Sequence, residues 1–271
     1  MTPAQRLREV LAAPGLEVMP GCFDALSAKL VADAGFKVTF MSGFAVSAAR
    51  LGLPDTGLIS FAEMLDSLRN CASGAARIPL IGDGDTGYGN ALNVQRTVVE
   101  YARAGAAAVT IEDQVSPKKC GHTRGKLVIP REEARMKIRA AVDARRDADI
   151  LILARTDARA VHGFDEALDR CRDFEMEGAD IIFLEAAALT AFHMKSWGQG
   201  FDSYIHIGEV ANLANISPSR ELAAFAHSFP LARWAGRSAS NPDGSWRQME
   251  RGASRSSNRS PRLTCFLPDR R

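Results

Sequence analysis

The 271-residue sequence contains no apolar run that approaches the ~20 residues needed to span a bilayer. Its N-terminus, Met1–Arg6, leads into a mixed helical pattern rather than the apolar core of a signal peptide. The formal net charge is only +2, which gives no general electrostatic case for binding nucleic acid or an anionic membrane. We therefore expect a soluble, cytoplasmic protein that acts on a small molecule.

Paired cysteine spacing is also absent from the sequence. No C-x-x-C pair occurs, and the number of cysteines is odd: Cys22, Cys71, Cys120, Cys171 and Cys265. Such a scattered set is typical of reduced thiols and argues against a disulfide framework or a zinc site. Only Cys120 lies in a chemically distinctive segment.

What the sequence does contain is a repeated alternation of apolar runs with helical patterns. Hydrophobic residues make up 46% of the chain, enough to bury a sizeable core. The apolar runs predict strands at 17–21, 37–43, 78–83, 108–113, 150–157 and 180–185. The periodic segments predict helices at 3–11, 25–34, 61–72, 93–104, 131–145 and 165–177. This repetition predicts a parallel α/β fold, either a barrel or a doubly wound sheet.

Polar residues at the strand ends separate these two folds. They are Ser42, Asp83 with Asp85, Glu112, Arg155 with Asp157, and Glu185. In a barrel the C-terminal ends of all strands open onto one face, so these side chains would meet at one ligand. We therefore favour a (β/α)8 TIM barrel over residues 1–235, with weakly marked seventh and eighth strands near 204–210 and 225–234. Residues 236–271 lack periodicity and predict a disordered, solvated basic tail.

The stretch GDGDTGYG at positions 82–89 places two carboxylates among four glycines directly after an apolar run. Carboxylates this close repel one another unless a cation lies between them, and Glu112 at the next strand end adds a third. Asp83, Asp85 and Glu112 therefore predict a Mg²⁺ site, with Mn²⁺ as an alternative occupant. A dinucleotide motif is rejected because the aspartates would oppose a pyrophosphate, and an EF-hand because its twelfth position is Val94. An Asp/Gly turn without a ligand stays open as an alternative.

A second segment, SPKKCGHTRGK at positions 116–126, is a long basic connection with one thiol at its middle. Neighbouring Lys and His side chains lower a cysteine pKa from its reference near ~8.5, which would make Cys120 a usable acid or base. Gly121 and Gly125 suggest the mobility of a lid that closes over a site. The alternative is a solvated basic loop in which the cysteine is incidental. We call residues 116–126 the lid.

Four motifs together resemble the isocitrate lyase and phosphoenolpyruvate mutase superfamily: KKCGH at 118–122, DGDTGYG at 83–89, IEDQ at 111–114 and ARTD at 154–157. The resemblance covers roughly residues 6–185. Its KKCGH loop is similar to that of the carbon-carbon lyase branch, such as 2-methylisocitrate and dimethylmalate lyases. It implies a homotetrameric barrel that binds a small carboxylic acid beside Mg²⁺, held mainly by Asp85 with contributions from Asp83 and Glu112.

The resemblance also implies a role for each residue of the rim. Those implied to bind the substrate are Ser42, Gly43, Phe44, Gly121, His122 and Arg155. Cys120 would protonate the carbanion, while Asp55 and Glu185 would organise hydrogen bonds around metal and substrate. Taken alone, Arg155 also fits a structural ion pair with Asp157, and Asp55 also fits a turn.

The implied reaction is Mg²⁺-dependent retro-aldol cleavage of a 2-hydroxy di- or tricarboxylate, of the 2-alkylmalate or methylisocitrate type, to a 2-oxo acid and a carboxylate. Two alternatives stay open: an oxaloacetate decarboxylase, and an inactive barrel that only binds a metabolite or a partner. After Glu185 the sequence departs from the family, and Asn212 and Asn215 are the nearest substitutes for an expected asparagine. We hypothesise that a frameshift or a degenerate terminus replaces the end of the barrel and weakens its assembly.

Overall fold

The computed structural model describes residues 1–13, 17–121, 125–185, 204–205, 207–208 and 225–226. By its internal contacts the chain divides into two units, Met1–Phe229 and Pro230–Arg271, and all described residues lie in the first. The predicted tail, the domain boundary after residue 235, and most of the segment that departs from the family therefore lie outside the described residues.

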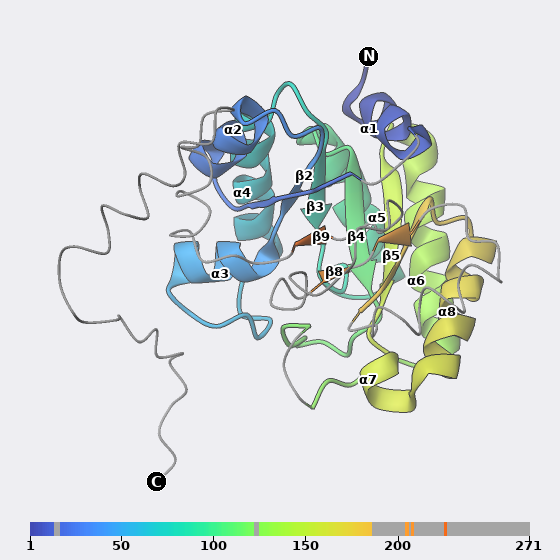
Figure 1. The fold of residues 1–271 in the computed structure, drawn as a ribbon. Helices are drawn as coiled ribbons and strands as arrows, with labels where there is room; N and C mark the ends of the chain where they lie inside the picture. Colours follow the sequence, from blue (N-terminus) through green and yellow to red (C-terminus); the bar gives the residue numbers. More distant parts are fainter. Residues whose placement is uncertain (14–16, 122–124, 186–203, 206, 209–224, 227–271) are drawn as a thin grey trace, which may run out of the picture. The chain divides into compact units, whose positions relative to one another are not determined.

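Seven parallel strands form one sheet in the order in which they occur along the chain (Figure 1). They are β1 (Gly21–Cys22), β2 (Thr39–Met41), β3 (Leu80–Asp83), β4 (Ala108–Glu112), β5 (Leu151–Thr156), β6 (Ile181–Leu184) and β7 (Tyr204–Ile205). A separate parallel pair joins β8 (Ile207–Gly208) to β9 (Phe225–Ala226). The sequential order has no reversal of the kind that marks a doubly wound sheet, so among the described strands it favours the barrel.

Helices alternate with these strands and pack against the sheet. They are α1 (Pro3–Ala12), α2 (Ala25–Asp33), α3 (Gly43–Leu51), α4 (Phe61–Gly74), α5 (Ala91–Arg103), α6 (Arg131–Ala144), with a 3-10 turn η1 (Arg145–Asp147), α7 (Arg159–His162) and α8 (Phe164–Met176). Helix α2 packs beside α4, and α5 beside α6 (Figure 1). The side chains of Thr2, Asp24 and Ser60 each cap a helix by accepting a hydrogen bond from the backbone three residues later.

The six strands and six helices predicted from periodicity are all present, and the structure differs from the prediction in three places. The first strand is confined to Gly21–Cys22, because Pro20 has no N–H and joins β2 only through its carbonyl, which accepts from Phe40. Helix α3 was not predicted. It follows β2 with Ser42 as its N-cap, so no loop separates strand from helix. The short helix α7 was also missed.

Strands β3, β4, β5 and β6 bury both of their faces, in two different clusters. Leu80 and Ile152 pack in the larger cluster, together with apolar residues of the surrounding helices. Ile81, Leu151 and Leu153 alternate with them and pack in a second cluster, which also contains residues of α1. Alternation between two buried faces explains why the strands read as continuous apolar runs rather than as an apolar and polar alternation.

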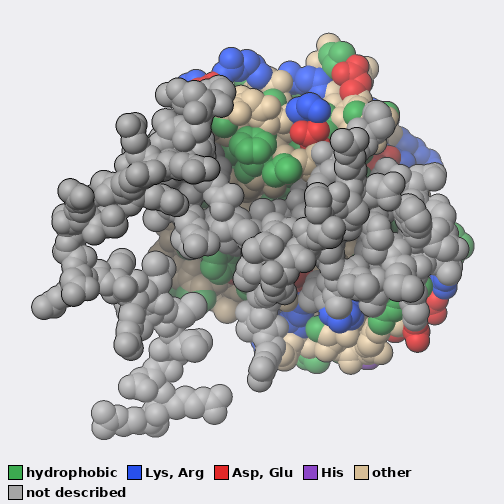
Figure 2. Space-filling view, in the orientation of Figure 1, with side chains coloured by type: hydrophobic (Ala, Val, Ile, Leu, Met, Phe, Trp, Pro, Cys, Tyr) green, Lys and Arg blue, Asp and Glu red, His purple; other side chains and the backbone are tan. Residues whose placement is uncertain are grey.

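In the part of the chain that the structure describes, no helix combines the length and apolar character needed to cross a membrane. On the face shown in Figure 2, described basic side chains lie interspersed with acidic ones. This distribution agrees with the small net charge of +2.

Core packing between α4 and β3 gives a first prediction. Leu68 is fully buried, and its Cδ1 lies so close to Gly82 that a Cβ there would be 2.8 Å away. We expect Leu68→Ala to lower the free energy of unfolding by about 2–5 kcal/mol through the cavity it leaves. Leu92→Ala, at a position 72% exposed, should change it by less than about 0.5 kcal/mol. Urea denaturation of both variants checks this, and equal losses would contradict the packing.

Candidate active site

The polar strand ends predicted from the sequence do lie at one end of the sheet. Asp83 ends β3, Glu112 ends β4 and Glu185 follows β6, while Glu112 pairs in register with Arg155 of β5. These four side chains are at most 9% exposed. The parallel order of the strands thus brings three carboxylates and one guanidinium to the same buried region.

The turn after β3 is fixed by its own backbone. Asp83 accepts hydrogen bonds from the backbone N–H of Gly43 (3.0 Å, at Oδ2) and of Asp85 (3.1 Å, at Oδ1). Asp85 itself has φ 48°, a left-handed conformation that a non-glycine residue rarely adopts. The Asp85 carbonyl accepts from the N–H of Glu112 at 2.9 Å, and its Oδ2 accepts from the Tyr88 hydroxyl at 3.3 Å. This strained turn therefore presents the Asp85 carboxylate in one orientation.

The residues predicted to bind substrate after β2 have structural contacts here. Ser42 is buried, and its Oγ accepts from the N–H of Ala45 at the start of α3. Gly43 lies so close to Asp83 that a Cβ would be 2.7 Å from Oδ2, so a larger residue would have to displace the Asp83 carboxylate. Phe44 is 42% exposed. These contacts tie the start of α3 to the Asp83 turn.

Lys118 of the lid forms ion pairs with two of the buried carboxylates, those of Asp55 and Asp85. Its Nζ lies 2.6 Å from Asp55 Oδ1 and 2.7 Å from Asp85 Oδ1, and all three side chains are at most 6% exposed. The sequence predicted Asp55 and Asp85 as site residues but did not single out Lys118. The structure therefore places an ammonium group where the sequence predicted a divalent cation next to Asp85.

Burial and charge shift the titration of this cluster. Burial raises the pKa of Asp85 to about 6, with Lys118 opposing the increase. Burial also raises the pKa of Glu112 well above its usual value, although Arg155 opposes it. For Lys118, burial alone would lower the pKa, but the surrounding carboxylates, Asp85 foremost, raise it overall. Lys118 is therefore charged, while the raised pKa values of Asp85 and Glu112 mean that each carboxylate binds either a proton or a nearby cation.

Buried oxygen atoms without hydrogen bonds test whether these residues suit Mg²⁺. Glu112 Oε1 is buried and has no hydrogen-bond donor among the described residues. Asp85 Oδ1 and Glu185 Oε2 are also buried, and each faces a cation, Lys118 at 2.7 Å and Arg155 at 3.4 Å. Hard carboxylate oxygens in this state are the ligands that Mg²⁺ prefers, so Asp85 and Glu112 fit the cation chemically. Asp83 fits less directly, because both of its oxygens accept backbone hydrogen bonds. Among the described residues, no three His, Cys, Asp or Glu side chains are gathered as a metal-binding group.

Arg155 forms the ion pair with Asp157 that the sequence left open. Its Nε donates to Asp157 Oδ2 at 2.9 Å and its Nη2 to Oδ1 at 3.1 Å. Nε also lies 3.3 Å from Glu112 Oε2, and Nη2 lies 3.4 Å from Glu185 Oε2. The Phe183 ring stacks against the guanidinium at 5.3 Å. The Arg155 guanidinium is thus fixed by contacts with three carboxylates and one aromatic ring.

The lid returns over the same region. Its stem is closed by Gln114, whose amide exchanges two hydrogen bonds with the backbone of Lys119, at 2.9 and 3.1 Å. The Cys120 N–H donates to the Asp55 carbonyl at 3.0 Å. Gly121 lies against Arg155 and Glu185, so the predicted glycine and the backbone of the lid next to Cys120 do reach the strand ends. His122, also predicted to bind substrate, lies outside the described residues.

Two charged residues of this region, Lys118 and Lys126, were not predicted as site residues, and Asp157 was predicted at the strand ends only as an ion-pair partner of Arg155. A signal for the lysines was available in the charge balance, because Arg155 alone leaves several buried carboxylates at the strand ends without a cation. Loop lysines were the nearest source of positive charge. The sequence does not indicate which of these lysines are buried, since Lys118 is buried while its neighbour Lys119, an identical residue, is exposed.

A cavity of about 340 Å³ lies elsewhere, at the N-terminal ends of the strands. Its lining includes Arg6, Arg69, Ile78, Leu80 and Gly105, and no residue of the candidate active site. The strand-end region described above, and not this cavity, contains the chemically active groups.

The ammonium of Lys118 generates a second prediction. Without it, Asp55 and Asp85 would be buried charges without a partner, so Lys118→Met should lower the free energy of unfolding by about 3 kcal/mol in the presence of a chelator. Mg²⁺ should restore part of this loss by supplying positive charge. Lys119→Met, an exposed lysine of the same lid, is the matched control and should change it by less than about 0.5 kcal/mol. Chemical denaturation with and without Mg²⁺ measures both; equal stability of the two variants would refute the role given to Lys118.

The raised pKa of Asp85 generates a third prediction. Because the pKa of about 6 in the folded protein exceeds the ordinary aspartate value of 3.8, folding favours the protonated form, and this contribution to stability is lost as the pH rises through 6. Asp85→Asn cannot lose a proton. Its free energy of unfolding relative to the parent protein should therefore increase by on the order of 1–3 kcal/mol between about pH 4 and pH 7. Denaturation with chelator at both pH values checks this, and a pH-independent difference would contradict it.

Comparison with known proteins confirms the resemblance found in the motifs. The family described as phosphoenolpyruvate phosphomutase matches residues 7–201. The 2,3-dimethylmalate lyase of Eubacterium barkeri is 48% identical over 186 residues, which are 69% of this chain and 64% of that protein. The 2-methylisocitrate lyase of Aeropyrum pernix is 48% identical over 184 residues, 68% of this chain and 58% of that protein. This chain thus spans less than two thirds of the length of either relative.

A solved structure gives the same result for the fold. Phosphonopyruvate hydrolase, in complex with oxalate and Mg²⁺, superposes with a TM-score of 0.73 at 30% identity and covers 93% of this chain and 88% of its own. The parallel α/β fold class predicted from the sequence is thereby confirmed. From the match over residues 7–201 and the shared fold, we conclude that the chain belongs to the phosphoenolpyruvate mutase and isocitrate lyase superfamily.

Proposed function

We propose that this protein is a Mg²⁺-dependent carbon-carbon lyase. Its substrate would be a 2-hydroxy di- or tricarboxylate of the 2-alkylmalate or methylisocitrate type, cleaved to a 2-oxo acid and a second carboxylate. One observation carries the proposal: buried carboxylates, a fixed guanidinium and the lid segment that contains Cys120 meet at the same strand ends. The relatives named dimethylmalate lyase and methylisocitrate lyase support this class of substrate.

The metal would be held by Asp85 and by Glu112, whose Oε1 has no hydrogen-bond donor among the described residues, with Asp83 contributing through its position in the turn. When bound, Mg²⁺, or Mn²⁺ in its place, supplies a Lewis acid for the oxygens of the substrate. The phosphonopyruvate hydrolase solved with Mg²⁺ supports this choice of cofactor. Lys118 would have to share its carboxylate partners with the metal, because it already contacts Asp85 at 2.7 Å.

The chain's own residues would bind the substrate and move the proton. Arg155, which Asp157 holds by two hydrogen bonds, would present its charge to a substrate carboxylate. Glu185, 3.4 Å from Arg155, and Asp55, which contacts Lys118, would keep these cations in place. One of the buried strand-end carboxylates would accept the proton of the substrate's 2-hydroxyl group as the carbon-carbon bond breaks, and Cys120 would donate a proton from its thiol to the carbanion released by cleavage. Burial of the site would exclude solvent from that step.

Two alternative functions stay distinguishable from this one. An oxaloacetate decarboxylase would use the same metal and Arg155 but would not depend on a proton donor on the lid. A protein that only binds a metabolite or a partner would show no turnover. We also propose, as the sequence predicts, a cytoplasmic location and a homotetramer that is weakened if the end of the barrel is replaced.

The assay for this function is the fourth prediction. Release of pyruvate or glyoxylate would be measured from 2-alkylmalates, methylisocitrate, isocitrate and oxaloacetate, with Mg²⁺ or with EDTA. We expect cleavage of at least one 2-hydroxy acid, abolished by EDTA and lowered about 10²-fold or more by Cys120→Ala. Ser116→Ala, at an exposed position of the same lid, is the control and should retain activity.

Other outcomes of this assay assign the alternatives. Loss of lyase turnover in Cys120→Ala with retained oxaloacetate decarboxylation would separate the two enzymes. Folded protein that binds Mn²⁺ but turns over no substrate would support the binding-only function and contradict the lyase.

A further inference from the structure

Lys126, the last residue of the lid, contacts both the lid backbone and a carboxylate at the strand ends. Lys126 Nζ lies 2.6 Å from Asp157 Oδ1 and donates to the carbonyl of Gly121 at 2.5 Å. The Lys126 side chain is 3% exposed and the Asp157 side chain is fully buried. One buried ammonium therefore joins the backbone of the lid, next to Cys120, to the carboxylate at the end of β5.

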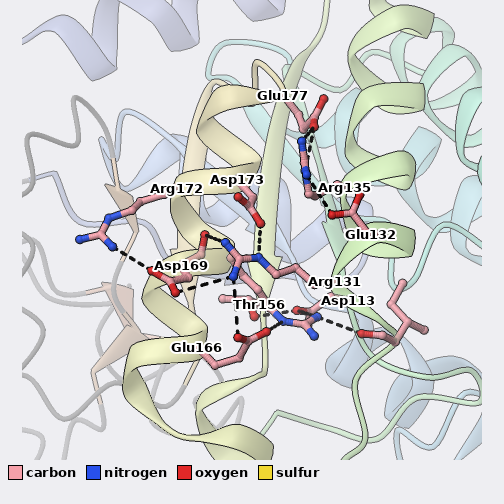
Figure 3. A network of polar contacts seen from close by, with 12 residues as sticks. Asp113, Arg131, Glu132, Arg135, Thr156, Glu166, Asp169, Arg172, Asp173 and Glu177 are labelled. Atoms are coloured by element: carbon pink, nitrogen blue, oxygen red, sulfur yellow. Dashed lines mark hydrogen bonds and ion pairs between the residues drawn. The ribbon is translucent and has the colours of Figure 1, made fainter.

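Asp157 is itself rigidly anchored. Its backbone N–H donates to Asp113 Oδ1 at 2.9 Å, while Asp113 Oδ2 accepts from Thr156 Oγ1 at 2.6 Å and from Arg170 at 3.1 Å. Figure 3 shows Asp113 and Thr156 in this network, which continues through the charged residues of α6 and α8. Burial opposes ionisation of Asp157, but Arg155 and Lys126 together hold its pKa below the usual value. Asp157 is therefore a fixed, charged acceptor.

The same carboxylate holds the guanidinium of the candidate active site. Asp157 Oδ1 accepts from Arg155 Nη2 at 3.1 Å in addition to Lys126, and Oδ2 accepts from Arg155 Nε at 2.9 Å. The lid backbone also packs directly on this arginine, since a Cβ at Gly121 would lie 2.6 Å from Arg155 Nη2. The position of the lid and the orientation of Arg155 thus depend on one shared acceptor.

We propose that Lys126 is a positioning residue that latches the lid in its closed place. It does so by holding the Gly121 carbonyl against the Asp157–Arg155 pair, and it thereby keeps Cys120 over the strand ends. Lys126 touches no reacting atom; it acts through Gly121 and Asp157. The proposal extends the function inferred above, because a proton donor on a lid is effective only while the lid is closed.

Lys119 provides a natural comparison within the lid. It is exposed, and its Nζ donates to the carbonyl of Gly125 at 2.8 Å. It therefore makes the same kind of bond to lid backbone as Lys126, with the same charge, but reaches no residue of the strand ends. Lys119→Met removes a lid lysine without removing the link to Asp157.

Alkylation of Cys120 by iodoacetamide, followed by peptide mass spectrometry, tests the latch without any assay of activity. We expect Lys126→Met to speed alkylation by about fivefold or more, because the lid opens more often. Lys119→Met should stay within about twofold of the parent protein. Cys22, Cys71 and Cys171 are buried and serve as internal controls, since their labelling would report general unfolding instead.

A second variant guards against misfolding. If Lys126→Met does not fold, Lys126→Arg keeps a charge beside Asp157 but cannot place one nitrogen between both acceptors, and it should speed Cys120 alkylation by about threefold. Labelling of Cys120 at the parent rate in whichever of these variants is folded would overturn the proposal. So would an equal increase in Lys119→Met.

Kinetics add a readout that depends on the proposed function. Lys126→Met should lower kcat about tenfold or more, while Mn²⁺ affinity stays within about twofold because Lys126 contacts neither Asp85 nor Glu112. Unchanged kcat in an enzyme with accelerated Cys120 alkylation would overturn the positioning role. If the parent protein turns over no substrate, the proposed function fails, but the alkylation comparison still decides whether Lys126 holds the lid.

Discussion

Carboxylates buried at the ends of parallel strands require positive charge beside them, and the candidate active site is arranged around this requirement. Asp85 and Glu112 are at most 4% exposed, far too buried to be solvated individually. Arg155 from β5 and Lys118 from the lid provide the compensating charge in the described residues. The unsatisfied oxygens that remain are what makes a divalent cation a reasonable further partner. Charge compensation thus links the barrel, its lid and its proposed cofactor.

The lid is held by the same charges that it covers. Lys118 joins it to Asp55 and Asp85, while Lys126 joins it to Asp157. Its two anchoring lysines stand on either side of Cys120, so the thiol segment is fixed from both directions. The contacts that hold the lid and the charge pairs of the strand ends are therefore made by the same residues. An enzyme built this way would couple its proton donor to the ionic state of the strand ends.

Much of this arrangement was predictable from the sequence, for identifiable reasons. Apolar runs and helical periodicity located every strand that positions the site, because strands buried on two faces cannot be polar inside. Polar residues at the ends of these runs then located Asp83, Glu112 and Arg155, because parallel strands in sequential order share one end. Helix α3 was missed since its N-cap, Ser42, directly follows β2, so no loop marks the boundary between strand and helix. The partners of the charges were missed for a different reason: Lys118 and Lys119 are adjacent and alike, yet only one is buried.

By itself, the sequence determined the fold class, the family and the residue types that meet at the strand ends. These follow from local patterns of burial and from short motifs, which need no knowledge of distant contacts. Only the tertiary structure decided that Lys118 faces Asp55 and Asp85, that Asp157 holds Arg155, and that Lys126 ties Gly121 to Asp157. Lys118 and Asp55 are 63 residues apart, and Lys126 and Asp157 are 31 apart. Such pairing depends on how the lid folds over the sheet. Hydrophobic periodicity cannot predict it, because periodicity shows which side of a helix or strand is buried and not which residue lies against that side.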